Sequence, residues 1–278
     1  MSLKINSNTQ GMFANNQLRL TDSSLSAVLN RISTGKKINS AADDASGLSI
    51  ANSLRSQALG MGQAMQNAND AISITQIADG AFDEATTIID SIRTKSIQAA
   101  NSGQSLESRQ AIQADIDKSL ASLDQIANNT SYNGQSLLSG TFSNKSFQVG
   151  GNSGETINLS IGSIQTSNLG NGEKGLLADI DVTTQDGAQS AIEVADQALK
   201  QVNSIRSDMG STQNQLTSTI NNLATSRVNT YSSESTIMDA DYAEESMVLN
   251  KMNSLLTART FAAQQANVAQ KNVISLLV

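Results

Sequence analysis

The feature that most constrains the fold is a seven-residue spacing of apolar residues in two long stretches of the chain. Within residues 187–223 the main row is Ala188, Ala195, Val202, Met209, Leu216 and Leu223, beside Ala191, Ala198 and Ile205. Within residues 70–100 the rows are Ala71, Ala78, Ala85, Ile92 and Ala99, and Ile74, Ala81 and Ile88. Such heptads predict long helices that pack as coiled coils.

One residue breaks this pattern. Lys95 is the next member of the row that holds Ile74, Ala81 and Ile88, so a charge stands where the pattern favours Ile or Leu. A lysine can lay its stem along an apolar seam and keep the ammonium in water. Alternatively, the seam ends there, or the position belongs to a contact surface. The residues alone leave these three interpretations open.

The two chain ends also carry helical patterns. Residues 3–33 have Leu18, Leu25 and Ile32 seven apart, with Val28 beside them and Gly35 as a C-terminal cap. In residues 240–276 the rows are Tyr242, Leu249, Leu256 and Ala263, and Met252, Ala266 and Val273, the latter interrupted by Arg259. Further helices are predicted over 44–100 and 105–128. We expect the end seams to pack against each other or against other copies.

The middle of the chain has a different period. Phe147 and Val149, then Ile157, Leu159 and Ile161, alternate with polar residues on either side of a Gly-rich turn, which predicts a β-hairpin. Residues 163–186 are polar and Gly-rich and are expected to be irregular. The predicted fold is mainly α, with long antiparallel coiled-coil helices from both chain ends and a small β-hairpin insert.

Composition excludes several function classes. The 278 residues include no Cys, His, Pro or Trp, which rules out disulfides, thiolate or imidazole metal sites and His-dependent catalysis. The absence of Pro suits long helices. A net charge of −7 disfavours nucleic acid as a partner. No apolar run reaches the ~18 residues of a membrane-spanning helix, and the first residues do not resemble a cleaved secretion signal.

Three local motifs have simpler explanations than a ligand. Residues 170–175 match G-x-G-x-x-G, but the strand before and the helix after are missing, which favours a flexible loop over a nucleotide site. Asp43 and Asp44 are expected to cap a helix start rather than to act together. The cluster of Asp239, Asp241, Glu244 and Glu245 could bind a hard cation, but acids favour a helix N-terminus without one. We predict no enzyme activity, metal or cofactor.

Longer motifs carry a family resemblance. The segments RISTGKKINSAADDASGLSIANSLRSQ and NANDAISITQIADGAFDEATTII, together with STIMDADYAEESMVLNKMNSLLTARTFAAQQAN and NVISLLV, resemble bacterial flagellins. The resemblance covers about 1–162 and 187–278. The stretch from TKSIQAANSGQSLESR to TSYNGQSLLSGTFSNKSFQVG is most similar to flagellins of the Campylobacter and Helicobacter relatives.

The resemblance implies a subunit of the extracellular flagellar filament, the passive propeller of swimming, in a near-minimal form without large outer domains. It implies an inner-core helix and spoke (1–40), outer-core helices and hairpin (41–162), a short variable segment (163–186), an outer-core helix (187–235) and an inner-core helix (236–278). The implied partners are other copies of the chain, an export chaperone, the filament cap protein and the hook–filament junction proteins. Export through the flagellum's own type III apparatus needs no cleaved signal.

Two residue sets follow from this assignment. The inner-core polymerisation seam is expected to comprise Leu18, Leu25, Val28, Ile32, Leu249, Met252, Leu256 and Val273. The outer-core seam is expected to comprise Ala78, Ile88, Ile92, Val202, Met209, Leu216 and Leu223. Since the end helices have little else to pack on, we expect both chain ends to be disordered in the monomer and to fold on polymerisation.

The resemblance also gives Lys95 a setting. In flagellins detected by Toll-like receptor 5 the corresponding stretch resembles L-Q-R-V-R-E-L-A-V-Q, whereas residues 89–98 read IDSIRTKSIQ. Ser91 then replaces the receptor-contacting Arg, Lys95 replaces a Leu, and Asp115 stands where the family has Glu. We expect the receptor to detect this chain poorly. A hook–filament junction protein and a secreted adhesin or immunomodulator on the same scaffold are the competing interpretations.

Overall fold

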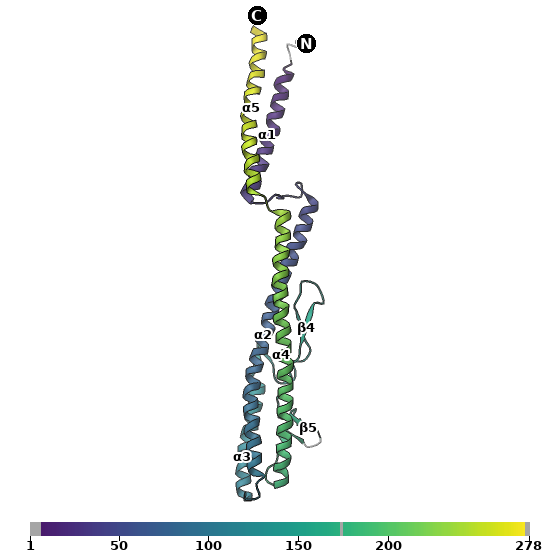
Figure 1. Ribbon diagram of the computed structural model, residues 1–278, viewed down its shortest axis with the longest axis vertical. Coiled ribbons are helices and arrows are strands. Elements are labelled where there is room, and N and C mark those ends of the chain that lie inside the picture. The colour runs from purple at the N-terminus through teal and green to yellow at the C-terminus, as the bar shows by residue number, and fades with distance from the viewer. Residues whose placement is uncertain (1–6, 173–174, 276–278) are drawn as a thin grey trace. The chain divides into compact units, whose positions relative to one another are not determined.

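The structure is a computed structural model that describes residues 7–172 and 175–275, with only the backbone given at 171, 270 and 273–275. Across these residues the chain forms five α-helices (Figure 1). They are α1 (Thr9–Thr34), α2 (Ala45–Ala99), α3 (Leu106–Asn129), α4 (Gln185–Met238) and α5 (Tyr242–Ser275). Each begins and ends within a few residues of its predicted range where the structure describes it, so the helical heptads and breaker residues were interpreted correctly.

Side chains and one glycine set the helix ends. The Asn8 side chain accepts a hydrogen bond from the Gly11 N–H and caps α1, which ends at Gly35 in the left-handed region (φ +68°). The Asp44 carboxylate accepts from the Gly47 N–H at 2.9 Å, and the Ser105 hydroxyl caps α3. These contacts confirm the predicted roles of Gly35 and Asp44.

Three short antiparallel strand pairs lie between α3 and α4 in the sequence. They are β1 (Ser131–Tyr132) with β2 (Gln135–Ser136), β3 (Lys145–Gln148) with β4 (Thr156–Leu159), and β5 (Gly170–Asn171) with β6 (Gly175–Leu176). The β3–β4 pair confirms the predicted hairpin, with Phe147 opposite Ile157. Of the strands with described burial, β4 shows the clearest alternation, because Ile157 and Leu159 face the core.

The described residues of the segment, 163–172 and 175–186, contain more regular structure than the sequence suggested. They contain two two-residue strands, β5 and β6, and a 3-10 turn, η1 (Leu177–Asp179), so the expected irregular structure holds only outside these short elements. Gly170 has φ +137°, and a Cβ on it would lie 2.7 Å from the Gly175 carbonyl oxygen, which explains the glycine. Five buried apolar side chains anchor the segment to the core: Ile164, Leu169, Leu177, Ile180 and Val182. Their spacing matches neither helix nor strand, which is why periodicity missed them.

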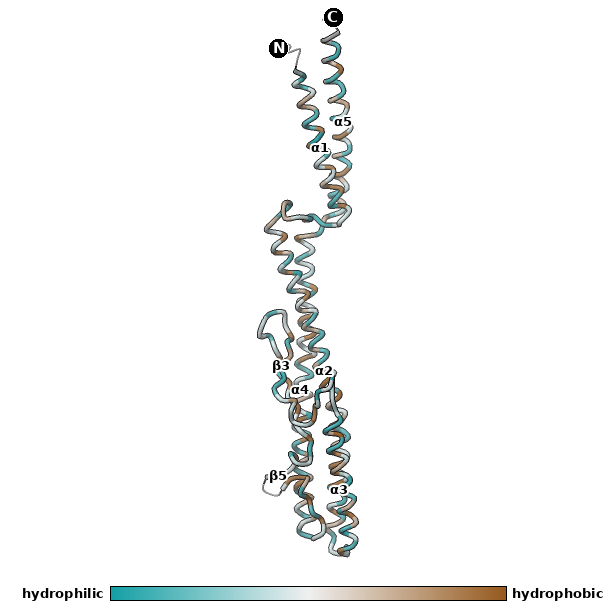
Figure 2. The backbone as a smooth tube through the Cα atoms, turned by 180° about the vertical axis from the view of Figure 1, so that it is seen from behind, coloured by the Kyte–Doolittle hydropathy of each residue, from teal (hydrophilic) through white to brown (hydrophobic). Residues whose placement is uncertain are grey.

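Contacts divide the chain into two compact units. We call residues 57–228 the central unit, and residues 1–56 with 229–278 the terminal unit. The predicted boundaries at 40/41 and 235/236 remain predictions. In the central unit α2, α3 and α4 lie side by side and the strands pack against them (Figures 1 and 2). The largest fully buried side chains there include Phe82, Ile89, Ile92, Ile116, Leu123, Leu137, Leu138 and Leu159.

The terminal unit is built differently. Here α1 packs antiparallel to α5 (Figure 1). Two backbone hydrogen bonds join the connector between α1 and α2 to the connector between α4 and α5. The Lys37 N–H donates to the Met238 carbonyl at 2.7 Å, and the Ala240 N–H donates to the Gly35 carbonyl at 3.0 Å. A small apolar cluster of Ile38, Ala51 and Met238 lies beside them. No helix within 7–172 or 175–275 combines the length and hydropathy needed to cross a membrane.

Candidate functional site

The first candidate surface is the pair of terminal helices. Of the predicted inner-core seam, Val28 is buried at 2% exposure. The remaining seam residues with described side chains are half-buried: Leu18, Leu25, Ile32, Leu249, Met252 and Leu256. The side chain of Val273 lies outside the described residues. The structure thus brings these side chains to one interface, and that interface covers them only in part.

Polar contacts fix the register of α1 against α5. Arg259, which interrupts the apolar row, donates to the Gln17 carbonyl at 2.8 Å and to the Thr21 hydroxyl. At the end near the connectors, Arg31 Nε lies 2.7 Å from Glu245 Oε1. The seam therefore tolerates Arg259 because its guanidinium finds a backbone carbonyl and a hydroxyl on the opposite helix.

Apolar side chains are also exposed outside this seam on both helices. On α5, Met247, Phe261 and Val268 fall on one heptad row and are 68%, 69% and 46% exposed. On α1, the exposed large apolar side chains are Met12, Phe13, Leu20 and Leu29. Sequence reasoning missed this second row, which stands out only when the paired face is known. Exposed apolar surface of this extent marks an interaction site.

The second candidate surface lies on the three-helix region. Of the predicted outer-core seam, Ala78, Ile92, Val202, Met209 and Leu216 are buried, and Ile88 and Leu223 are half-buried. The seam is completed by a row that sequence reasoning overlooked. It consists of Thr75, Phe82, Ile89 and Ser96, each at most 1% exposed.

This overlooked row explains Lys95. The row from Ala71 to Ala99 and the row from Thr75 to Ser96 stay buried along the whole stretch, so together they form the seam, and Lys95 belongs to a row that flanks it. Ile74 is buried, Ala81 and Ile88 are half-buried, and the Lys95 side chain is 29% exposed. The assumption that Lys95 occupies the seam was therefore wrong. At this level the seam consists of Ile92 and Ser96, and Lys95 stands at its edge.

Lys95 has a partner within the same chain. Its Nζ lies 3.4 Å from Asp115 Oδ2 on α3, and Lys118 Nζ lies 3.9 Å from Asp115 Oδ1. The structure thus joins two of the three residues predicted for the receptor-sensing patch. Ser91 is exposed on α2, and no hydrogen bond or ion pair links it to Lys95 or Asp115 in the described part of the chain. An exposed pair of this kind contributes about 0–1 kcal/mol.

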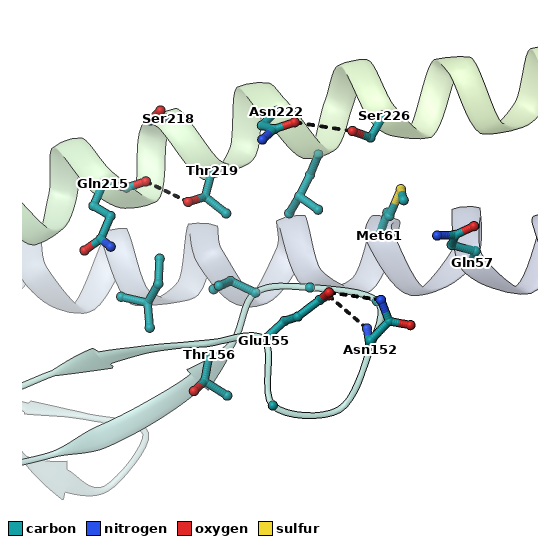
Figure 3. Close-up of a pocket in the computed structure, with 16 residues that line it drawn as sticks. Gln57, Met61, Asn152, Glu155, Thr156, Gln215, Ser218, Thr219, Asn222 and Ser226 are labelled. Atoms are coloured by element: carbon teal, nitrogen blue, oxygen red, sulfur yellow. Dashed lines mark hydrogen bonds between the residues drawn. The ribbon is translucent and has the colours of Figure 1, made fainter.

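A polar cleft of about 520 Å³ lies where the β3–β4 turn meets α2 and α4 (Figure 3). Glu155 accepts hydrogen bonds from the Asn152 side chain at 2.9 Å and its backbone N–H at 3.0 Å, and these bonds hold the pKa of the carboxyl below its usual value. The turn passes close to α2, since a Cβ on Gly60 would lie 3.4 Å from Gly151 Cα. Gly60 therefore leaves room for the hairpin tip. The cleft offers no paired acid and base.

The acidic motifs have structural roles. Asp43 accepts from the N–H groups of Asn39 and Ser40 and holds the connector before α2. Asp241 caps α5 by accepting from Ala243 and Glu244, while Glu245 pairs with Arg31. Within residues 7–172 and 175–275, no group of three or more Asp or Glu side chains is arranged to hold a metal ion. Gly170 and Gly175 of the G-x-G-x-x-G match belong to the β5–β6 pair.

Comparisons with known proteins assign the scaffold. Residues 5–143 match the profile of the bacterial flagellin N-terminal helical region, and residues 192–277 match that of the bacterial flagellin C-terminal helical region. The chain belongs to the bacterial flagellin family. The resemblance read from its motifs is therefore confirmed.

Similar flagellar proteins differ in length. Flagellin B of Helicobacter pylori is 51% identical over 170 residues, which cover 61% of this chain and 33% of that protein. This chain therefore spans about a third of such relatives. The flagellar filament 31.3 kDa core protein of Treponema maltophilum is 34% identical across 98% of this chain and 99% of its own length.

Solved structures agree on the fold. A protein described as flagellar hook-associated, from Vibrio parahaemolyticus, superposes with a TM-score of 0.61 at 15% identity, covering 70% of this chain and 99% of that one. At this identity the likeness speaks for the helical architecture alone. The mainly α fold with long antiparallel helices and a small hairpin insert is confirmed.

Proposed function

We propose that this flagellin is the structural subunit of a bacterial flagellar filament, and that it acts by polymerising rather than by catalysis. The observation that carries the proposal is the incomplete burial of apolar side chains in the terminal unit. Its two helices half-cover their shared seam and leave a second apolar row, Met247, Phe261 and Val268, open to a further partner. A chain that must bury such faces without a second protein does so against its own copies.

In this assignment the segments 1–40 and 236–278 form the inner core, and 41–162 with 187–235 form the outer core. The segment 163–186 takes the place of larger outer domains. The filament is extracellular and is reached through the flagellar type III apparatus. An export chaperone, the filament cap protein and the hook–filament junction proteins are the proposed partners besides the chain itself.

The direct experiment is to shear surface filaments from cells that express this chain as their only flagellin. We expect it to be the main protein of the filaments, and cells without it to lose swimming. A junction protein would be present in only a few copies at the filament base. An adhesin would leave swimming intact when deleted. Either result would contradict the proposal.

We also propose that Toll-like receptor 5 detects this chain poorly. Ser91 lacks the charge of the Arg that the receptor contacts in detected flagellins, and Lys95 with Asp115 forms an internal ion pair in place of an apolar side chain. Both changes alter the charge and shape of one exposed edge between α2 and α3.

A receptor reporter assay tests this second proposal. The wild-type monomer is expected to give a weak response, and Ser91→Arg with Lys95→Leu is expected to raise it by about tenfold or more, since one buried charged contact changes binding on that scale. Lys200→Leu, at an exposed lysine on α4, is the matched control. A strong response of the wild-type monomer at low dose would refute the proposal.

A further inference from the structure

The β1–β2 turn, β3 and α2 enclose a hollow lined by apolar side chains and also by Asn133, Gln135 and Ser146. Its volume is about 250 Å³. Ile74 and Phe142 form a buried floor, Tyr132 and Phe147 are half-buried walls, and Lys145 is exposed at the rim, with its Nζ 5.9 Å from the centre of the Phe142 ring. A cavity of about 150 Å³ already holds a benzene molecule. The hollow, here called the aromatic socket, thus has room for an apolar side chain.

A side chain that suits the aromatic socket lies at the other end of α3. Leu106 is 61% exposed in the first turn of this helix. Its neighbour Glu107 has no ion-pair partner among the described residues, and neither has Lys145. The described central unit exposes four other large apolar residues: Leu59, Ile77, Ile97 and Val228. None of these four has an Asp or Glu as its neighbour in the sequence.

The two features cannot meet within one copy. Helix α3 has 24 residues, so its ends lie about 36 Å apart, and Tyr132 follows its C-terminal end. A patch that meets a different patch on the next copy joins subunits head to tail, and it extends into an open chain when the rotation between copies does not close into a ring. Such a contact is what a filament requires.

We propose that Leu106 of one copy inserts into the aromatic socket of the next, with Glu107 paired to Lys145 of that neighbour. This inference rests on the proposed polymerisation, and it names one contact by which the central units join. The acid and the base are complementary in charge and each lies directly beside the apolar element it would align.

Charge exchange in the full-length chain tests the contact. Glu107→Lys and Lys145→Glu are each expected to raise the critical concentration for seeded assembly at low salt by about tenfold. The double exchange, Glu107→Lys with Lys145→Glu, is expected to restore assembly to near the wild-type value. Lys145→Glu with Glu84→Lys, which has the same net charge but uses an exposed acid on α2, is the matched control and is expected not to restore it.

The double exchange also separates this contact from a simpler role of Glu107. An acid in the first turn favours a helix, and Glu107→Lys removes that effect in the single and the double variant alike. The contact would be overturned if the single variants assemble like wild type, or if the double variant assembles no better than the single variants. In either case, assembly of the wild-type chain would still support the proposed function. Failure of the wild-type chain to assemble on filament seeds would overturn both.

Cysteine pairing gives a second measurement, since the chain has no Cys of its own. Glu107→Cys with Lys145→Cys is expected to give a ladder of disulfide-linked copies after oxidation of the polymer. The variant Glu84→Cys with Lys145→Cys is the control. Polymers of the first variant that yield no ladder would contradict the contact.

Discussion

The central and terminal units are both built from helices with heptad patterns, but they bury the apolar side chains of these helices to different degrees. In the central unit α2 packs against both α3 and α4, and Phe82, Ile89 and Ile116 are fully buried. In the terminal unit α1 has α5 as its helical partner, and Phe13 and Phe261 are 67% and 69% exposed. A helix pair can bury one face of each member, and the central unit adds a third helix and strands. From this difference we predict that the central unit is stable alone, whereas the terminal unit depends on further copies.

The largest expected effect is in the central core. Phe82→Ala should lower the free energy of unfolding by about 3–5 kcal/mol, because it removes a fully buried ring and leaves a cavity. Phe261→Ala removes the same ring from the exposed face of α5 and should change monomer stability by less than about 0.5 kcal/mol. Urea denaturation followed by far-UV circular dichroism measures both. Equal losses would erase the distinction between the units.

We expect Phe261 to matter more for assembly than for the stability of the monomer. Phe261→Ser is expected to raise the critical concentration for polymerisation by roughly ten- to a hundredfold, since burial of such a side chain is worth about 1.5–3 kcal/mol. Sedimentation of seeded polymers measures this concentration. Gln264→Ser, at a neighbouring exposed position on α5, is the control. If Phe261→Ser assembles like the control, the far face of α5 is not a contact surface.

A smaller effect is expected where α2 and α4 exchange charges. Arg206 Nε lies 2.9 Å from Asp79, and its Nη1 lies 3.3 Å from Asp83. The hydrogen bond to Asp79 raises the pKa of Arg206, so the guanidinium stays charged at all working pH values. Arg206→Met should destabilise the central unit by about 1 kcal/mol, as expected for a partly exposed network. Lys200→Met on the same helix should have no measurable effect in the same urea titration.

Lys95 distinguishes an edge position from a seam position. At the edge, Lys95→Leu exchanges an exposed ion pair for modest apolar contact and should alter the free energy of unfolding by less than about 1 kcal/mol. In a closed seam the same change would bury a full leucine and stabilise by about 1.5–3 kcal/mol. Thermal denaturation decides between the two. Stabilisation in the higher range would restore the original seam assignment.

The smallest effect concerns pH and the connector of the terminal unit. Hydrogen bonds from Ser40 and then Asn39 hold the pKa of Asp43 below its usual value. The stabilisation is therefore complete above about pH 4 and is lost as the pH falls through the lowered pKa. The protection of the Asn39 and Ser40 amides, measured relative to their intrinsic exchange rates, should fall in acid for wild type and should be low at all pH values for Asp43→Asn. Unchanged exchange in that variant would remove the role given to Asp43.

Sequence periodicity predicted the helices well because Pro-free heptads and capping residues are local signals. It misplaced Lys95 because the second buried row contains Thr75 and Ser96, whose polar side chains hid it, so a flanking row was taken for the seam. It also missed the exposed row of Phe261, because which of two apolar faces is paired depends on the partner helix. The anchors Leu177 and Ile180 follow no period and are visible only in the fold.

The dependence of the terminal unit on other copies is tested most directly by amide hydrogen exchange on the monomer and on the assembled filament. We expect the α1 and α5 amides to exchange rapidly in the monomer and to become strongly protected in the filament. The buried parts of α2, α3 and α4 should be protected in both. Equal protection of α1 and α5 in the two states would contradict the account.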